Sequence, residues 1–122
     1  AAGRRGVPAI VAPGCLDMVN FWAPDTVPEK FKGRTFYQHN PNITLMRTTP
    51  EECDWMGRWI GTRLKEMTGP VRFLLPEGGV SLLSVPGQPF HDPAADAAIP
   101  ALDAGRYRRE DHRRPPRLGR GR

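Results

Sequence analysis

The 122-residue sequence has only two cysteines, and it lacks the signatures of several common protein classes. Cys15 and Cys53 lie far apart and form no CxxC pair, which argues against a disulfide framework and favours reduced thiols in the cytoplasm. No apolar run approaches the roughly 18 residues that a membrane-spanning helix needs, and no signal-peptide pattern is visible. No His, Cys and Asp residues have the spacing of a metal site. We therefore expect a cytoplasmic protein that does not enter the membrane and has no metal centre.

Basic side chains are concentrated at one end of the chain. The formal net charge is +5, but residues 106–122 hold eight Arg against Glu110 and Asp111. Residues 1–105 carry ten basic and eleven acidic side chains, so the body of the chain is close to neutral. The high pI therefore does not argue that the folded part binds nucleic acid. We expect residues 100–122 to form a basic, disordered tail whose contact with nucleic acid would be non-specific.

Two apolar runs joined by one helical segment form the clearest pattern in the chain. Val7 to Ala12 and Val71 to Leu75 are expected strands, and each ends at a proline. Between them, Thr49-Pro50-Glu51-Glu52 is a capping box, which predicts a helix from about Pro50 to Thr68. A strand, a helix and a second strand in this order imply a parallel pair with a right-handed crossover.

Shorter elements surround this unit. Extended pieces are expected at Thr35 to His39 and at Ile43 to Arg47, on either side of an Asn40-Pro41-Asn42 turn. Asp92-Pro93 predicts the start of a short Ala-rich helix that ends near Ile99. The fold class that these elements predict is α/β, a partial Rossmann-like three-layer fold with a short parallel sheet.

A loop rich in Pro and Gly follows each of the two strands. In open α/β sheets, ligands bind beyond the carboxyl ends of the strands. Gly14 would allow a ligand close to the backbone, and Gly78-Gly79 with Ser81 could hold a phosphate or carboxylate. The second loop matches no nucleotide fingerprint, and each loop alone is equally well explained as an ordinary turn. Two such loops at the ends of neighbouring strands strengthen the interpretation of each as part of a ligand site.

Reactive side chains in the chain each have a simpler alternative explanation. Cys15 would be a nucleophile if a helix N-terminus activated its thiol, but a small buried thiol is the favoured interpretation. His39 either belongs to a polar site or takes part in turn chemistry. His91-Asp92 suggests a metal or acid/base pair, but Asp92 is better explained as a helix N-cap. Trp55 and Trp59, four residues apart on the helix, are expected to pack against a missing neighbour rather than to stack on bases.

Five stretches of the sequence carry a family resemblance: PGCLDMVNF, DTVPEKFKGR, FYQHNPNITLMRTTPEE, GPVRFLLPEGGVSLL and GQPFHDPAAD. Together they resemble the C-terminal half of an uncharacterised protein family that is similar to the ATP-binding region of the plant tomato mosaic virus resistance protein. The resemblance covers roughly Gly3 to Ala98 and implies two Rossmann-like halves, ATP binding and no settled reaction. The residues that match the family's polar motifs are Gly14, Asp17, Asn20, Asp25, Thr26, His39, Asn40, Arg47, Gly78, Gly79 and Ser81.

The resemblance sets the functional expectation. Residues 1–99 would be a truncated C-terminal half-domain that binds a nucleotide, with ATP and Mg²⁺ as the implied cofactors. Its partner would be the N-terminal half of the same protein, and the intact protein would be a homo-oligomer. The Arg-rich run after Pro100 departs from the family and looks like a shifted reading frame or a fragment end, which would leave an exposed edge or apolar patch.

Two alternatives from other classes remain open. The first is an enzyme acting on a carboxylate or phosphate, with Cys15, Asp17 or His39 as participants. The second is a protein-interaction module or a nonfunctional gene fragment.

Overall fold

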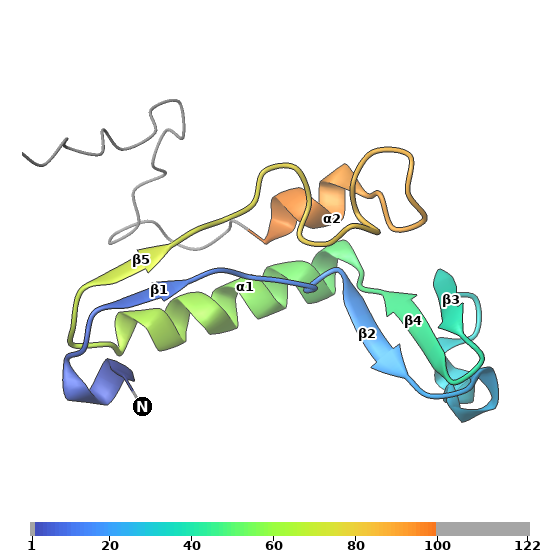
Figure 1. Ribbon diagram of the computed structural model, residues 1–122, viewed down its shortest axis with the longest axis horizontal. Coiled ribbons are helices and arrows are strands. Elements are labelled where there is room, and N and C mark those ends of the chain that lie inside the picture. The colour runs from blue at the N-terminus through green and yellow to red at the C-terminus, as the bar shows by residue number, and fades with distance from the viewer. Residues whose placement is uncertain (1, 100–122) are drawn as a thin grey trace, which may run out of the picture.

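The computed structural model describes residues 2–99 (Figure 1). The predicted tail, residues 100–122, lies outside this range. No helix within residues 2–99 is long and apolar enough to cross a membrane. The elements are η1 (Ala2–Arg5), β1 (Ala9–Val11), β2 (Met18–Phe21), η2 (Pro24–Thr26), η3 (Glu29–Phe31), β3 (Phe36–Asn40), β4 (Ile43–Arg47), α1 (Pro50–Lys65), β5 (Val71–Phe73) and α2 (Pro93–Ala98).

The predicted pair of parallel strands is present in the structure. β1 and β5 run parallel, with Ala9 opposite Val71 and Val11 opposite Phe73, and α1 lies between them in the chain. Figure 1 shows α1 running beside both strands. The α/β class and the short parallel sheet are therefore confirmed.

A second, antiparallel sheet of three strands has the order β2-β4-β3. β3 and β4 fall at the extended pieces expected from the sequence, and the turn between them forms as Asn42 N–H donates to Asn40 Oδ1 at 2.9 Å. β2 was not expected, because Met18–Phe21 was interpreted as part of the loop after the first strand. Its pairing partner β4 lies more than twenty residues away, so local sequence does not reveal the strand.

Helix α1 begins with the predicted capping box. Glu52 N–H donates to Thr49 Oγ1 at 3.2 Å, and Thr49 N–H donates to Glu52 Oε2 at 2.8 Å. The helix ends at Lys65, three residues earlier than predicted. The chain turns there because Thr68 N–H donates to Gly3 O, and Gly69 crosses so close to Gly6 that a Cβ would come within 2.4 Å of its carbonyl oxygen.

The core lies where α1 meets α2. α2 is capped as predicted, since Ala95 N–H donates to Asp92 Oδ1 at 3.0 Å. A Cβ at Gly57 of α1 would lie 2.5 Å from Ile99 O, so glycine is what lets the chain at the end of α2 approach so closely. The buried hydrophobic cluster there consists of Cys53, Val80, Ala95 and Ile99, with Leu16, Met56, Leu75 and Ala98 packed against them. The core thus supports the two loops that follow β1 and β5.

Candidate functional site

The loops after β1 and β5 are joined to each other. Cys15 N–H donates to Val80 O at 2.9 Å, and Ser81 Oγ donates to Asp17 Oδ2 at 2.5 Å. The expectation that these two loops meet at the strand ends is confirmed. Asp17 and Ser81, two residues named from the sequence as site candidates, are thereby bonded to each other, and the exposed Gly14 and Gly78 lie in the same two loops.

Asp17, in the first of these loops, is fully buried. Its Oδ1 accepts no hydrogen bond within residues 2–99, while its carbonyl oxygen accepts from Thr48 N–H at 3.1 Å. A carboxylate without solvent access holds the loops together rather than meeting a ligand directly. Ser81 adds to this framework, because its Oγ also accepts from Leu83 N–H at 3.0 Å.

Ser84 fixes the backbone of the second loop. Its buried Oγ accepts from the N–H groups of Val80 and Ser81, at 3.1 Å each. Gly79 has φ +118°, and a Cβ there would lie 2.9 Å from Ser84 Oγ, so this position requires glycine. Gly78 differs, because a Cβ there would meet nothing within 4 Å. The loop therefore has a part fixed by Ser84 and an open part at Gly78.

Cys15 occupies the turn at the end of β1. Its φ is 55°, in the left-handed region that residues with a Cβ rarely adopt, and its side chain is exposed. The favoured interpretation of a small buried thiol is therefore wrong. The hydrogen bond from Cys15 N–H to Val80 O holds this conformation, because it fixes the turn against the second loop.

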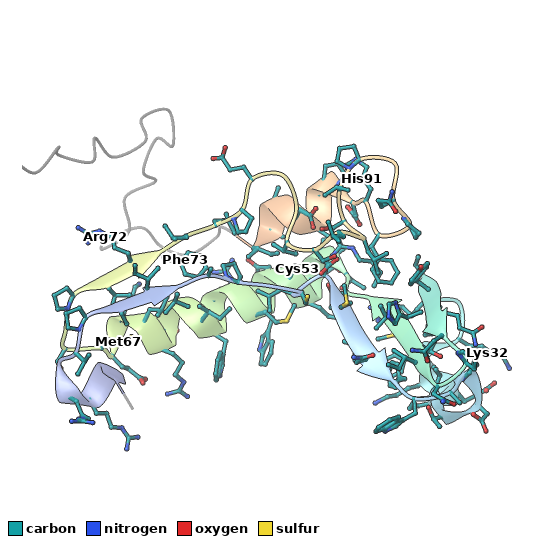
Figure 2. The ribbon with its side chains drawn as sticks, viewed as in Figure 1. Lys32, Cys53, Met67, Arg72, Phe73 and His91 are labelled. Atoms are coloured by element: carbon teal, nitrogen blue, oxygen red, sulfur yellow. The ribbon has the colours of Figure 1, made fainter. Side chains whose placement is uncertain are left out.

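A hollow of about 330 Å³ lies beside the open part of the second loop. It is lined by Leu75, Pro76, Glu77, Gly78, Gly79, Ser84, Pro86, His91, Pro93, Asp96 and Ala97. His91 was noted in the sequence but not assigned to the site. Its Nδ1 lies 3.2 Å from Ser84 O (Figure 2 labels the ring). Because a carbonyl oxygen only accepts, this contact is a hydrogen bond in the tautomer that carries the proton on Nδ1.

Charge limits what this hollow can hold. Its ionised lining side chains are the carboxylates of Glu77 and Asp96, and no Lys or Arg lines it. Arg47 offsets one of them, because its Nη2 donates to Asp96 Oδ1 at 2.6 Å. A hollow with this charge suits a neutral group that carries hydrogen-bond donors better than a polyphosphate chain.

The guanidinium of Arg47 is hydrogen-bonded to other residues of the protein. Its side chain is only 6% exposed, and besides Asp96 it donates to Asp92 O and to Thr48 Oγ1, both at 3.4 Å. These bonds connect β4 to α2. The structure thus gives Arg47 a structural role, and contact with a ligand stays a prediction.

The remaining candidate residues lie with the antiparallel sheet. Asn20 is on β2, His39 is on β3 near the ring of Tyr37, and Asp25 and Thr26 are in η2. Asn40 and Thr26 make local turn bonds, the latter from its Oγ1 to Ala23 O at 2.7 Å. A second hollow of about 480 Å³ lies there, lined by Pro24, Val27, Pro28, Glu29, Lys32, Gly33, Phe36, Gln38 and Thr44. Figure 2 shows Lys32 at the opposite end of the molecule from Met67.

Two titratable groups next to the core have shifted pKa values. Burial raises the pKa of the Cys53 thiol, whose Sγ lies 3.3 Å from Thr48 Oγ1. The Arg34 guanidinium hydrogen-bonded to Glu52 lowers the pKa of that carboxyl. Neither group lines either hollow, so both shifts concern stability. Within residues 2–99, no three His, Cys, Asp or Glu side chains are grouped so as to hold a metal ion.

Comparison with known protein families identifies the family to which the chain belongs. Residues 1–109 match the C-terminal domain of an uncharacterised protein family, UPF0261. The chain belongs to the UPF0261 family. The resemblance stated from the sequence motifs is therefore confirmed. The UPF0261 match also runs past residue 99, where the sequence analysis ended the half-domain.

Similar proteins come from bacteria and a plant. A UPF0261 protein of Rhizobium meliloti is 56% identical over 118 residues, 97% of this chain and 30% of its own length. A UPF0261 protein of Mesorhizobium japonicum is 58% identical over 99 residues, 81% of this chain and 25% of its own length. The ToMV resistance protein Tm-1(GCR237) of tomato, Solanum lycopersicum, is 39% identical over 96 residues, 79% of this chain and 13% of its own length. The chain thus spans at most about a third of these relatives.

Proposed function

We propose that this UPF0261 C-terminal domain forms one wall of a nucleotide-binding crevice, with ATP as the ligand. The observation that carries the proposal is the joined pair of loops at the carboxyl ends of β1 and β5, where Cys15 N–H bonds Val80 O and Ser81 bonds Asp17. Ligands of open α/β sheets bind at this position. The hollow beside Gly78 provides space for a ligand at this position, and the tightly packed loop at Gly79 holds the wall of the hollow in one conformation before the ligand binds.

The charge of the hollow favours a different part of the nucleotide at each of the two walls of the crevice, this chain and the rest of the family protein. The hollow would receive the neutral nucleoside, because Glu77 and Asp96 repel phosphate. The phosphates, with Mg²⁺ bound to them, would face the rest of the family protein, which supplies the other wall. In this arrangement the intact protein binds ATP, and the present chain alone binds it weakly. A homo-oligomeric state of the intact protein and a cytoplasmic location stay predictions.

Calorimetry with ATP and Mg²⁺ tests the proposal on this chain and on the intact Rhizobium meliloti relative. A Cβ at position 78 would meet nothing within 4 Å, so we expect Gly78→Leu to keep the fold, to occupy part of the hollow and to lower the affinity by about tenfold or more. Gln88→Leu is the matched control, because Gln88 is exposed and does not line the hollow. Gly79 is unsuitable, since substitution there strains the loop itself. Absence of ATP binding by the intact protein, or equal affinity for both variants, would refute the proposal.

An enzyme acting on a carboxylate or phosphate is the second candidate. The exposed Cys15, held at φ 55° beside the joined loops, favours it, because strained backbone gathers at active sites. Release of ADP or phosphate from ATP by the intact relative, lost on Cys15→Ser with ATP binding retained, would identify an enzyme. Binding without turnover supports the ligand-binding function.

A further inference from the structure

Thr44, in β4, carries a buried hydroxyl group that has no hydrogen-bond partner within residues 2–99. The residue is only 5% exposed, and its Oγ1 neither donates nor accepts a hydrogen bond there. The great majority of buried polar groups in proteins are hydrogen-bonded, because an unpaired one lowers the stability of the fold. Thr44 also lines the hollow of about 480 Å³ beside the antiparallel sheet. A molecule bound in this hollow would supply the partner that the hydroxyl lacks.

The strand register places the side chain of Thr44 on the side of the sheet where this hollow lies. Gln38 of β3 is directly opposite Thr44, and Phe36 lies two positions before Gln38 on the same strand. Residues at opposite and at alternate positions project from the same face of a sheet, so these three side chains share one face. All three line the hollow. The antiparallel sheet therefore forms one wall of the hollow, and Thr44 belongs to that wall.

The segment between β2 and β3 forms the other wall. Figure 1 shows this segment returning beside the three-stranded sheet. Its residues that line the hollow include Pro24, Val27 and Pro28. The rings of Phe31 in η3 and Phe21 in β2 lie 5.7 Å apart, and Arg34 Nη2 donates to Arg47 O at 2.7 Å, so the segment is held against the sheet at two points. Both walls are thus in place before a ligand binds, which favours affinity.

The side chains of the lining indicate the chemical class of the ligand. The ionised ones, Lys32 and Glu29, form an ion pair with each other, so the lining has no net charge. Phe36 and the two prolines offer apolar surface for a flat ring. The hydroxyl of Thr44 and the amide of Gln38 can each both donate and accept a hydrogen bond. This lining suits an uncharged molecule that has an aromatic ring and a polar group able to donate and accept.

We propose that this hollow is a binding site for a small uncharged aromatic amide, and that Thr44 Oγ1 forms a hydrogen bond with the amide group of the ligand. The hydroxyl lowers the stability of the free protein and contributes a hydrogen bond only when the ligand is bound. A residue that breaks a rule of folding in this way is typical of a functional site. Among the described residues, none lines both this hollow and the one beside Gly78, so the proposed site is separate from the nucleotide crevice.

Benzamide is the probe for the first test, because it has an aromatic ring and one uncharged amide. We expect saturable chemical-shift changes at the backbone amides of Phe36, Gln38 and Thr44 in the isotope-labelled 122-residue chain, with a Kd of about 1 mM. Benzoate should bind about tenfold more weakly, because Lys32 is already paired with Glu29 and offers the carboxylate no free cation. Changes that do not saturate, or equal affinity for the two probes, would overturn the proposal. No ATP is added, so the result is independent of the proposed function.

Thr44→Val is the second test, because it removes the hydroxyl and keeps the shape of the side chain. The free protein loses an unpaired buried hydroxyl, so we expect Tm to stay the same or to rise, while the affinity for benzamide falls about threefold to tenfold. Thr44→Ser retains a hydroxyl and should retain the affinity. Thr62→Val is the control, because Thr62 is exposed on α1 and bonds within that helix, and it should leave the affinity unchanged.

Either of two results with Thr44→Val would refute the role of the hydroxyl. A fall in Tm of about 4 °C or more, or failure to fold, would mean that the hydroxyl is already hydrogen-bonded in the free protein, for example to a buried water. Unchanged affinity for benzamide would mean that the hydroxyl does not contact the ligand. Gln38→Leu tests the same wall at an exposed position, where folding does not depend on a buried group. We expect it to lower the affinity about threefold, and an unchanged affinity would also count against the site.

Discussion

At the scale of single residues, the hydrogen bond between Ser81 and Asp17 determines how the two loops are held together. Asp17 is fully buried, and the bond from Ser81 Oγ is the one its side chain accepts within residues 2–99. We expect Ser81→Ala to lower the free energy of unfolding by about 1–3 kcal/mol, because a buried carboxylate would lose its donor. Urea unfolding followed by circular dichroism measures this loss.

Thr62→Ala is the control for the Ser81 substitution. Thr62 Oγ1 donates to Arg58 O within α1 on an exposed part of the helix, so its hydroxyl leaves no buried partner behind. We expect a change within about 0.5 kcal/mol. If Ser81→Ala and Thr62→Ala cost the same, the bond to Asp17 does not stabilise the fold.

Residue roles were only partly predictable from the sequence. The loops and their Gly, Asp and Ser residues follow from turn chemistry and strand position, so Asp17, Gly78 and Ser81 were found. The partner of Arg47 was not predictable, because Asp96 is forty-nine positions away and only the packing of α2 brings it near. His91 was not assigned to the site from the sequence, because the neighbouring Asp92 was explained as a helix N-cap. The bond from His91 to Ser84 O depends on the loop conformation, which the sequence does not show.

At the scale of secondary-structure elements, the start of α1 gives a pH-dependent contribution to stability. The Arg34 guanidinium donates to both carboxylate oxygens of Glu52, at 3.2 and 2.7 Å, and lowers the pKa of Glu52 below its usual value. A carboxyl whose pKa is lower in the folded state than in the unfolded state stabilises the fold at pH values above its unfolded-state pKa. This contribution is lost as the pH falls through the folded-state pKa. The Glu52 side chain is 42% exposed, so solvent screening keeps the contribution modest.

Glu52→Gln tests this contribution. We expect the variant to be less stable than the wild type at pH 7 and the difference to shrink as the pH falls through the lowered folded-state pKa of Glu52, where the wild-type carboxyl becomes protonated. Thermal unfolding across this pH range measures the difference. Glu51→Gln is the charge-matched control, because Glu51 is exposed in the same helical turn. A stability difference for Glu52→Gln that is constant with pH would contradict the linkage.

The elements themselves were predictable where local signals exist. The capping box of α1, the Asp92 N-cap of α2 and the proline that follows each cap lie within a few residues, so the starts of both helices were found at the right position. β2 was not found, because four residues of mixed polarity become a strand only through pairing with β4. The end of α1 was placed too late, because contacts with Gly3 and Gly6 turn the chain before the Gly69-Pro70 signal.

At the scale of the whole molecule, the ion pair between Arg47 and Asp96 connects its two parts. Arg47 belongs to the antiparallel sheet and Asp96 to α2 beside the core, and their side chains are 6% and 21% exposed. We expect Asp96→Ala to lower the free energy of unfolding by about 3–5 kcal/mol, because it leaves the Arg47 guanidinium buried without its partner. Urea unfolding followed by tryptophan fluorescence measures the loss.

The double variant Arg47→Met/Asp96→Ala separates the ion pair from general packing. Because it removes the buried charge as well as its partner, it should recover a large share of the stability lost in Asp96→Ala. Glu66→Ala, which breaks a pair with Arg63 whose side chains are 56% and 58% exposed, should cost about 1 kcal/mol or less. An Asp96→Ala loss no larger than that of Glu66→Ala would mean that the antiparallel sheet and the core are held together by other contacts. A large loss that the double variant repairs would show that one buried ion pair connects α2 and the core to the antiparallel sheet.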